Sequence, residues 1–272
     1  MLAFYGYAPG RDTLNRGRVA ALKALELDDS LPEAHAAMAY GNFMWWWEWP
    51  DAERDFLRAI QLNANYTPAH HWYALFLAAM GRQEESLEQI RLAQELDPRS
   101  LIVRSAAAYI YYFARQNDAA IEECRTALAA DSHFVVAHYV LGLAYEAEKD
   151  YPQAIQEFQQ AVDSSGRPGS YLAALGHAYA VSGNRRAAEA ILAELNARAE
   201  QQYVGPSAQA TVWAGLGDKA QAIQWMQRAG QNNDAALIWM GVDPRWDTLR
   251  SDPWYQSELQ KHFVRREAPP TP

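Results

Sequence analysis

The residues best suited to metal chemistry in this 272-residue chain are histidines. His35, His70 and His138 stand at equivalent positions of a repeated pattern, and His71 directly follows His70. Neutral imidazole is a common ligand of zinc and related metals. On a helix, however, His70 and His71 would point about 100° apart, which prevents them from sharing one ion easily. Recurrence at one repeat position favours a packing role, so we expect no metal site.

Other catalytic patterns are weak. The segment 215–220 (Gly-Leu-Gly-Asp-Lys-Ala) resembles a dinucleotide-binding loop, but a predicted helix precedes it where that loop needs a strand. The sequence has no Gly-x-Ser-x-Gly elbow, no P-loop and no Cys-x-x-Cys pair. Carboxylates such as Glu84, Glu85 and Glu88 indicate a solvated helix face. We therefore predict a protein that is not an enzyme and has no catalytic residue and no cofactor.

Composition narrows the class of partner and the compartment. The net charge of −9 disfavours nucleic acid, because few cations are available to displace counterions from phosphates. Cys124 is the single cysteine, so no disulfide can form within the chain and a reducing compartment fits best. No apolar run reaches the roughly 18 residues that span a bilayer, and no secretory signal begins the chain. These observations predict a cytoplasmic protein that binds neither nucleic acid nor a membrane.

A regular spacing of residues predicts the elements that carry these side chains. Predicted helix-to-helix turns recur every 34 residues, at Gly81, Arg115, Lys149, Gly183 and Gly217. Small residues recur seven positions before these turns (Ala74, Ala108, Gly142, Gly176, Ala210) and five positions after them (Ser86, Ala120, Ala154, Ala188, Ala222). Such a repeat is typical of stacked helical hairpins that bury their apolar faces against their neighbours. A further unit fits upstream, with Ala39, Ala52 and Ala59, if one residue is inserted in its loop.

This pattern resembles the tetratricopeptide repeat, most strongly over residues 69–98 and 137–161, and it covers roughly residues 11–230. The resemblance implies an all-α, right-handed superhelical solenoid of antiparallel helix hairpins. Departures are the single closing proline, Pro98, and histidine in place of the usual tryptophan of the first helix. We expect a partial first repeat over 1–30, a solenoid of about six repeats over 31–230, short capping helices that close it over 231–263, and a disordered tail over 264–272.

The ending Asp-Pro-Arg-Trp-Asp-Thr-Leu-Arg-Ser-Asp-Pro over 243–253, with the tryptophan-rich segment and Ala-His-His-Trp-Tyr-Ala over 69–74, points to a narrower group. It is similar to the C-terminal tetratricopeptide regions of bacterial multidomain signalling proteins. Their N-terminal parts are winged-helix transcription regulators, serine/threonine kinases or nucleotide cyclases. The helix predicted at 14–27 lacks a full partner helix before it, because Met1–Tyr7 supplies at most the last turns. We therefore expect the sequence to be the C-terminal part of a longer protein, or to begin at an unnatural start.

A concave groove is the predicted binding site. In such a stack the first helix of each hairpin lines the concave face, with positions two, five, nine and twelve pointing inward. The predicted binding residues are Tyr40, Phe43, His71, Tyr109, Tyr112, Tyr139, Glu146 and His177. An apolar groove with tyrosine anchors suits an extended peptide or an amphipathic helix, whereas packing of the tyrosines against each other is the simpler alternative. Lysine and asparagine, which would clamp a terminal carboxylate, are absent from these positions.

We thus predict a protein–protein interaction module that binds a peptide or helix in this groove. The alternative is a regulatory or sensory arm of a larger bacterial transcription regulator or kinase, in contact with its own effector domain. Four tryptophans, Trp45, Trp46, Trp47 and Trp49, occupy the predicted loop that breaks the 34-residue spacing. They either pack over the adjacent hairpins or form a docking surface, since four exposed indoles are unfavourable in water.

Overall fold

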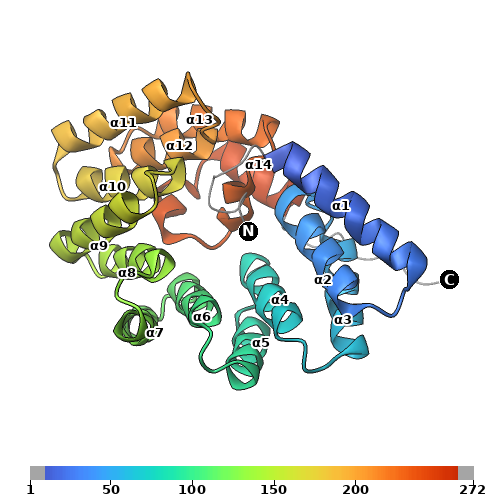
Figure 1. Ribbon diagram of the computed structural model, residues 1–272. Coiled ribbons are helices and arrows are strands. Elements are labelled where there is room, and N and C mark those ends of the chain that lie inside the picture. Colours follow the sequence, from blue (N-terminus) through green and yellow to red (C-terminus); the bar gives the residue numbers. More distant parts are fainter. Residues whose placement is uncertain (1–9, 263–272) are drawn as a thin grey trace.

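A computed structural model describes residues 10–262, with the backbone alone for residues 10–15 and 262, and every regular element in that range is helical. The α-helices are α1 (Gly10–Leu27), α2 (Pro32–Gly41), α3 (Trp49–Leu62), α4 (Thr67–Ala79), α5 (Gln83–Leu96), α6 (Leu101–Phe113), α7 (Asn117–Ala130), α8 (Val135–Ala147), α9 (Tyr151–Ser164), α10 (Gly169–Val181), α11 (Arg185–Ala199), α12 (Pro206–Gly215), α13 (Lys219–Gln231) and α14 (Pro253–His262). A π-helical turn, η1 (Asn42–Trp46), and two 3₁₀-helices, η2 (Ala235–Trp239) and η3 (Pro244–Leu249), complete them. Consecutive hairpins curve round into an open ring (Figure 1), which confirms the predicted all-α solenoid. The segment Met1–Tyr7 and the predicted tail 264–272 lie outside the described residues.

The 34-residue spacing corresponds to one recurring turn. Gly81, Arg115, Lys149, Gly183 and Gly217 all have φ between 62° and 86°, the left-handed region. In each turn the following N–H donates to the carbonyl of the residue four positions before the turn, as from Arg82 N to Leu77 O at 2.9 Å. This is the helix-ending bond of a Schellman motif, which satisfies a carbonyl that the helix leaves free. Arg115 and Lys149 adopt the same conformation although it costs a non-glycine residue about 1–2 kcal/mol.

The recurring small residues lie where neighbouring helices approach most closely. A Cβ added to Gly142 would lie 2.6 Å from the Phe158 ring, and one added to Gly176 would lie 2.8 Å from Val212. Ser86 is fully buried and donates from Oγ to the Ala74 carbonyl at 2.7 Å. A larger side chain at these positions would separate the helices, since interiors are packed to crystal-like density. The small-residue pattern therefore sets the helix spacing, as predicted.

The one-residue irregularity in the first hairpin lies in a helix. The predicted loop is therefore wrong for Trp45 and Trp46, which belong to the helical segment 42–46. That segment continues α2 as the π-helical turn η1, and Trp47 then takes the left-handed conformation, with φ 55°. Trp47 lies 34 residues before Gly81, so the spacing of turns is unbroken. A π turn absorbs one additional residue by widening the helix. The insertion thus lies between Ala39 and Trp47.

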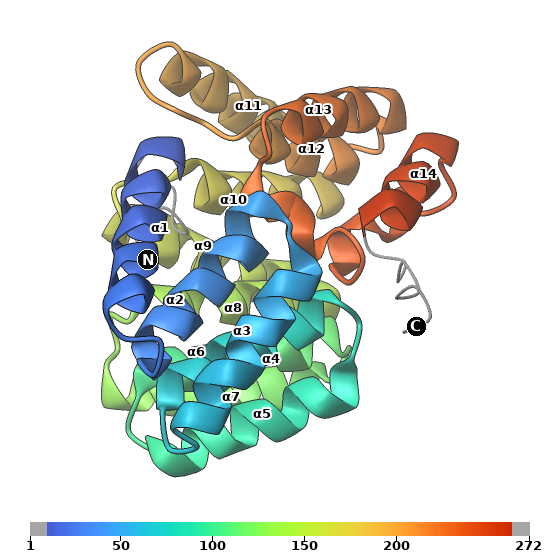
Figure 2. The same cartoon turned by 90° about the vertical axis from the view of Figure 1, so that its right-hand side faces the viewer.

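The residues after the last hairpin turn into the concave face. We call residues 232–250 the C-terminal segment; it carries η2 and η3. As expected of a cap, η3 contacts α12 and α13, but η2 also reaches η1 in the first hairpin. Figures 1 and 2 show this segment, in orange-red, inside the ring formed by the hairpins. Residues separated by most of the sequence therefore meet inside the ring.

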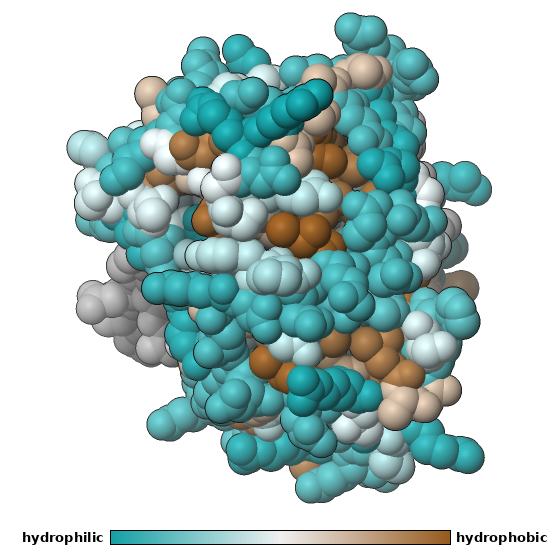
Figure 3. All heavy atoms as spheres, turned by 90° about the vertical axis from the view of Figure 1, so that its left-hand side faces the viewer, coloured by the Kyte–Doolittle hydropathy of each residue, from teal (hydrophilic) through white to brown (hydrophobic). Residues whose placement is uncertain are grey.

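The outer surface differs from the interior. In Figure 3, hydrophilic side chains cover most of the face on the left of Figure 1, and apolar ones form small separate patches. None of the helices in the range 10–262 combines the length and apolar character needed to cross a membrane. Most large apolar side chains of the described residues are buried at the helix interfaces or on the concave side, whereas Val19, Leu22 and Leu27 on α1 are exposed.

Candidate functional site

A cavity of about 660 Å³ lies between the concave wall and the C-terminal segment. Its wall comes from the first helices of successive hairpins, α2, α4, α6, α8, α10 and α12, together with η1, η2 and η3. Side chains of α3, α5, α7, α9 and α11 do not line it. The inward orientation predicted for the first helices therefore matches the cavity wall.

Four of the eight predicted groove residues line this cavity: Tyr40, His71, Tyr109 and Tyr139. All four stand at positions five or nine of their helices. The other four do not line it: Tyr112 and Glu146 stand at position twelve of their helices, Phe43 lies just beyond α2, and His177 stands at position nine of α10. From α2 to α8 the concave surface is thus open near the helix N-termini and covered near the C-termini, and on α10 the covered part already begins at position nine.

Burial explains why the second group is not available to a ligand in this structure. Phe43 is fully buried, and its ring centroid lies 6.0 Å from that of Trp239. Tyr112 is 1% exposed and donates from its hydroxyl to Asp243 Oδ1 at 2.9 Å. Glu146 and His177 are bonded to each other, with 3.0 Å between Oε1 and Nδ1. The chain's own segment or its own side chains occupy the places assigned to a partner.

The four tryptophans have separate surroundings. Trp45 and Trp46 line the cavity, and the Arg18 guanidinium lies 4.4 Å from the centroid of the Trp46 ring. Gly41 makes room for Trp46, because a Cβ there would lie 2.4 Å from the indole. Trp47 and Trp49 stack on each other, with 6.2 Å between centroids, and pack against the core. Docking by these indoles is untested and stays a prediction.

An ion pair that the sequence analysis did not identify forms the floor of the cavity. Asp243 is 1% exposed, and its Oδ2 accepts a hydrogen bond from an Arg245 guanidinium nitrogen at 2.6 Å. Burial would raise the pKa of Asp243, but the guanidinium, the Arg245 N–H and the Tyr112 hydroxyl together lower it below its usual value. The Arg245 side chain is itself 10% exposed and interacts with the Tyr139 hydroxyl. The Asp-Pro-Arg sequence was the available signal, although it indicated only a helix cap.

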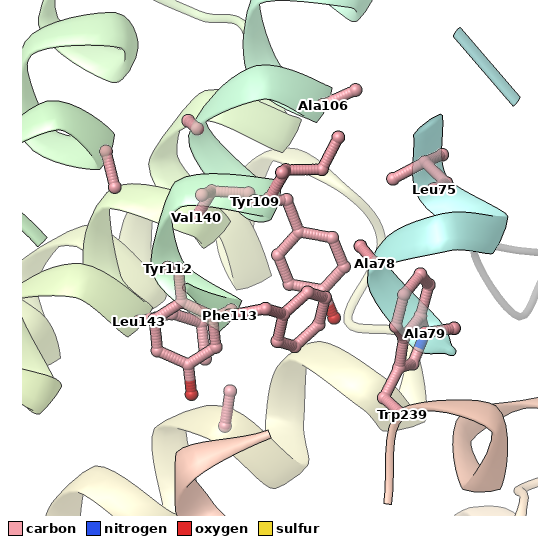
Figure 4. Packing of buried hydrophobic residues seen from close by; sticks show 14 of the residues in the cluster. Leu75, Ala78, Ala79, Ala106, Tyr109, Tyr112, Phe113, Val140, Leu143 and Trp239 are labelled. Atoms are coloured by element: carbon pink, nitrogen blue, oxygen red, sulfur yellow. The ribbon is translucent and has the colours of Figure 1, made fainter. Parts of the chain in front are cut away.

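Aromatic rings form most of the opposite walls. Tyr139 stacks on Tyr171 with 4.7 Å between centroids, and Tyr40 lies 4.9 Å from Trp72 in a tilted arrangement. Figure 4 shows Trp239 projecting from the C-terminal segment between Ala78 and Ala79 on α4 and the rings on α6. Rings held in this way give a ligand large contact area at little cost in side-chain entropy.

The cavity residue His71 should make folding stability fall in mild acid. Burial lowers the pKa of His71 from 6.5 to about 4. Between these two values the unfolded chain binds a proton that the folded chain does not. Stability is therefore complete above pH 6.5 and falls as the pH drops, by about 3 kcal/mol on reaching pH 4.

Urea unfolding at several pH values, compared with His71→Gln, checks this expectation. The difference in unfolding free energy between the two proteins isolates His71 from the other titrating groups. We expect this difference to change between pH 6.5 and 4 in favour of the variant. A constant difference would show that the pKa of His71 is the same in the folded and the unfolded protein.

Three histidines at equivalent repeat positions make the same contact with the loop before their helix. His70 and His138 each place Nε2 within 2.9–3.0 Å of a carbonyl oxygen six residues earlier, and His35 does the same with Asp29 O at 3.0 Å. On the other side of the ring, His138 Nδ1 lies 2.6 Å from Glu157, which raises the pKa of His138. Each histidine thus connects its helix to the preceding loop. Among residues 10–262 there is no group of three or more side chains suited to holding a metal ion.

Comparisons with known proteins agree with this architecture. The sequence pattern of a family described as "Tetratricopeptide repeat" matches residues 135–167. "Tetratricopeptide repeat protein 6" from Homo sapiens is 26% identical over 110 residues, which are 38% of this chain and 21% of that protein. The chain thus spans about a fifth of that relative.

Two solved structures have a similar fold. Human IFIT1, as a dimer with m7Gppp-AAAA, gives a TM-score of 0.67 at 22% identity, over 91% of this chain and 60% of its own. The Cut9–Hcn1 hetero-tetramer of the APC/C gives 0.61 at 16% identity, over 84% and 46% of the two chains. At these identities the likeness shows the fold alone.

Proposed function

This chain is a tetratricopeptide-repeat protein, and on that premise we propose that it is a non-catalytic interaction module that binds a short segment of a partner protein in its concave cavity. Such repeats form protein-interaction or scaffold modules. The observation that carries the proposal is the cavity of about 660 Å³, lined by the inward positions of six first helices. A long helix does not fit, because the C-terminal segment fills the other part of the groove. A few residues of an extended peptide match the space.

A protein partner is favoured over nucleic acid by the charges on the cavity wall. IFIT1, a structural neighbour, is seen with a capped oligoadenylate. Binding a phosphate chain requires cations that are free to pair with it. Here the one basic side chain among the described lining residues is Arg245, which is bonded to Asp243. Asp234 and Asp243 contribute negative charge to the same wall. Cut9, another neighbour, is held in an assembly with Hcn1.

Filling the cavity tests the proposal. Ala173 lines it from α10, so the ring of Ala173→Phe takes up space that the peptide needs. Random heptapeptides displayed on phage are selected on the wild-type protein, and the enriched peptides are then synthesised. We expect each peptide to bind Ala173→Phe at least about tenfold more weakly than the wild type.

The matched control is Ala129→Phe, which adds the same ring at an exposed position on α7. This control should bind the peptides as the wild type does, and circular dichroism should show equal helicity for all three proteins. Equal binding to the wild type and to Ala173→Phe would place the peptide site elsewhere. Failure to enrich any peptide would reject the proposal.

A regulatory arm is the second candidate function, and exposed apolar side chains on α1 favour it. Val19, Leu22 and Leu27 are 66%, 44% and 78% exposed. Contiguous apolar surface is typical of contacts with another domain or protein. This function predicts that α1 becomes covered when the effector domain is present, and slower hydrogen–deuterium exchange of the α1 backbone amides in the longer protein would detect it.

A further inference from the structure

The charged side chains on the cavity wall are already engaged in hydrogen bonds. Asp243 and Arg245 bond to each other, as described above. Asp234 is 8% exposed, and its two carboxylate oxygens accept from Ser207 N at 2.9 Å and from Ala236 N at 3.1 Å. An anionic ligand group would therefore enter a largely apolar cavity without a free cation, and a cationic group would find only Asp234, whose two oxygens already accept from backbone N–H groups. Such burial is strongly unfavourable.

The remaining titratable wall residues are also uncharged near neutral pH. Burial keeps the pKa of His71 low, as stated above, and it raises the pKa of Tyr109 and Tyr139. These groups contribute aromatic surface and neutral hydrogen-bonding atoms. The wall as a whole thus favours a ligand that carries no net charge on its buried part.

Two polar atoms of the wall lack hydrogen-bond partners. Within the described part of the chain, Ser105 Oγ and Trp45 Nε1 are buried and make no hydrogen bond. Ser105 is 1% exposed and lines the cavity from α6, and Trp45 lines it from η1. An indole N–H can only donate, and a hydroxyl can donate or accept. Both atoms are covered by neighbouring side chains in this structure, so an acceptor such as a carbonyl oxygen satisfies them once a ligand displaces this cover. A buried polar group without a partner is rare in proteins.

We infer that the cavity selects an uncharged, internal segment of a polypeptide, with an apolar side chain against the aromatic wall and backbone carbonyl oxygens accepting from Ser105 Oγ–H and Trp45 Nε1–H. This inference rests on the proposed function and names the chemistry of the partner. It excludes a free terminal carboxylate or a charged side chain at the buried position. The selected peptide would be bound through its middle.

Three small probes with the same apolar body test the selection by charge. N-acetyl-phenylalanine amide is neutral, N-acetyl-phenylalanine is an anion, and phenylalanine amide is a cation at acidic to neutral pH. Their dissociation constants are measured at pH 6.5 by ligand-observed NMR or calorimetry. We expect the neutral probe to bind and each charged probe to bind at least about tenfold more weakly. Equal binding of the three probes would overturn the inference.

Two variants test the two donors. Ser105→Ala removes a hydroxyl that has no partner within the described chain, so folding stability should be unchanged or slightly higher. The same variant should weaken the neutral probe by about three- to tenfold. Trp45→Phe should weaken it similarly while keeping an aromatic ring in place. Unchanged affinity in both variants would overturn the assignment of the donors.

The outcomes separate this inference from the proposed function. Binding of the neutral amide in the cavity, with no phage peptide enriched, would reject the protein-partner role and keep the charge selection. Peptides that bind in the cavity through charged residues would keep the role and reject the selection. Ala173→Phe should abolish binding of the neutral probe, and binding that survives this variant would show that the probe occupies another site.

Discussion

Asp243→Ala is expected to lower the free energy of unfolding by about 3–5 kcal/mol, because it leaves the Arg245 guanidinium buried without a counter-ion. Asp243 also accepts from the Tyr112 hydroxyl and from the Arg245 N–H, so the substitution removes three interactions from one buried carboxylate. Urea denaturation followed by circular dichroism measures the loss. Proteolysis should cleave the C-terminal segment sooner in this variant, since the segment loses its hydrogen bond to Tyr112 on α6.

The double variant Asp243→Ala, Arg245→Met distinguishes the cost of an unpaired charge from the value of the pair. We expect it to recover most of the lost stability, since it removes the orphan charge and fills the site with an apolar side chain of similar length. Asp247→Ala is the matched control: its ion pair with Arg115 spans 2.9 Å, but both side chains are 47% exposed. Its loss should be under about 1 kcal/mol. Equal losses for Asp243→Ala and Asp247→Ala would show that the Asp243 site is hydrated.

The repeating part of the fold could be predicted from the sequence because each unit is specified by local rules. Gly81 and its equivalents end helices through backbone conformation, and Gly142 sets the helix spacing through the absence of a side chain. Both requirements act within one or two hairpins, so they recur at a fixed period in the chain. The inward orientation of Tyr109 and Tyr139 follows from the same helical geometry.

The division of the groove could not be predicted, because it depends on a contact made across most of the sequence. Tyr112 and Asp243 are 131 residues apart and belong to no common repeat. Nothing in the period of the solenoid determines where a non-repeating segment folds back. The π turn at 42–46 is an intermediate case: the additional residue was visible, but an insertion can widen a helix or lengthen a loop, and only the structure distinguishes the two.

Trp239→Ala should be comparably damaging, with an expected loss of about 3–5 kcal/mol for removing a large buried aromatic side chain. Trp239 is 5% exposed and contacts rings from two parts of the solenoid. Its centroid lies 4.7 Å from that of Phe113 in a stacked arrangement, 5.4 Å from Tyr109 and 6.0 Å from Phe43 (Figure 4 shows the first two). The residue therefore joins η2 to the first hairpin and to α6 at once.

Loss of probe binding distinguishes the removal of the Trp239 contact from general destabilisation of the fold. Without the indole the C-terminal segment loses its contact with η1, and the cavity loses part of its wall. We therefore expect the neutral amide probe not to bind, even under conditions where the hairpins remain helical. Trp225→Ala is the control, because Trp225 is only half-buried on α13, with Arg228 lying 4.5 Å over its ring. We expect that variant to lose about 1 kcal/mol or less and to bind the probe normally. A Trp239→Ala protein that kept both its stability and its probe affinity would mean that the C-terminal segment stays in the groove without this anchor, held by contacts such as Tyr112–Asp243 and Arg115–Asp247.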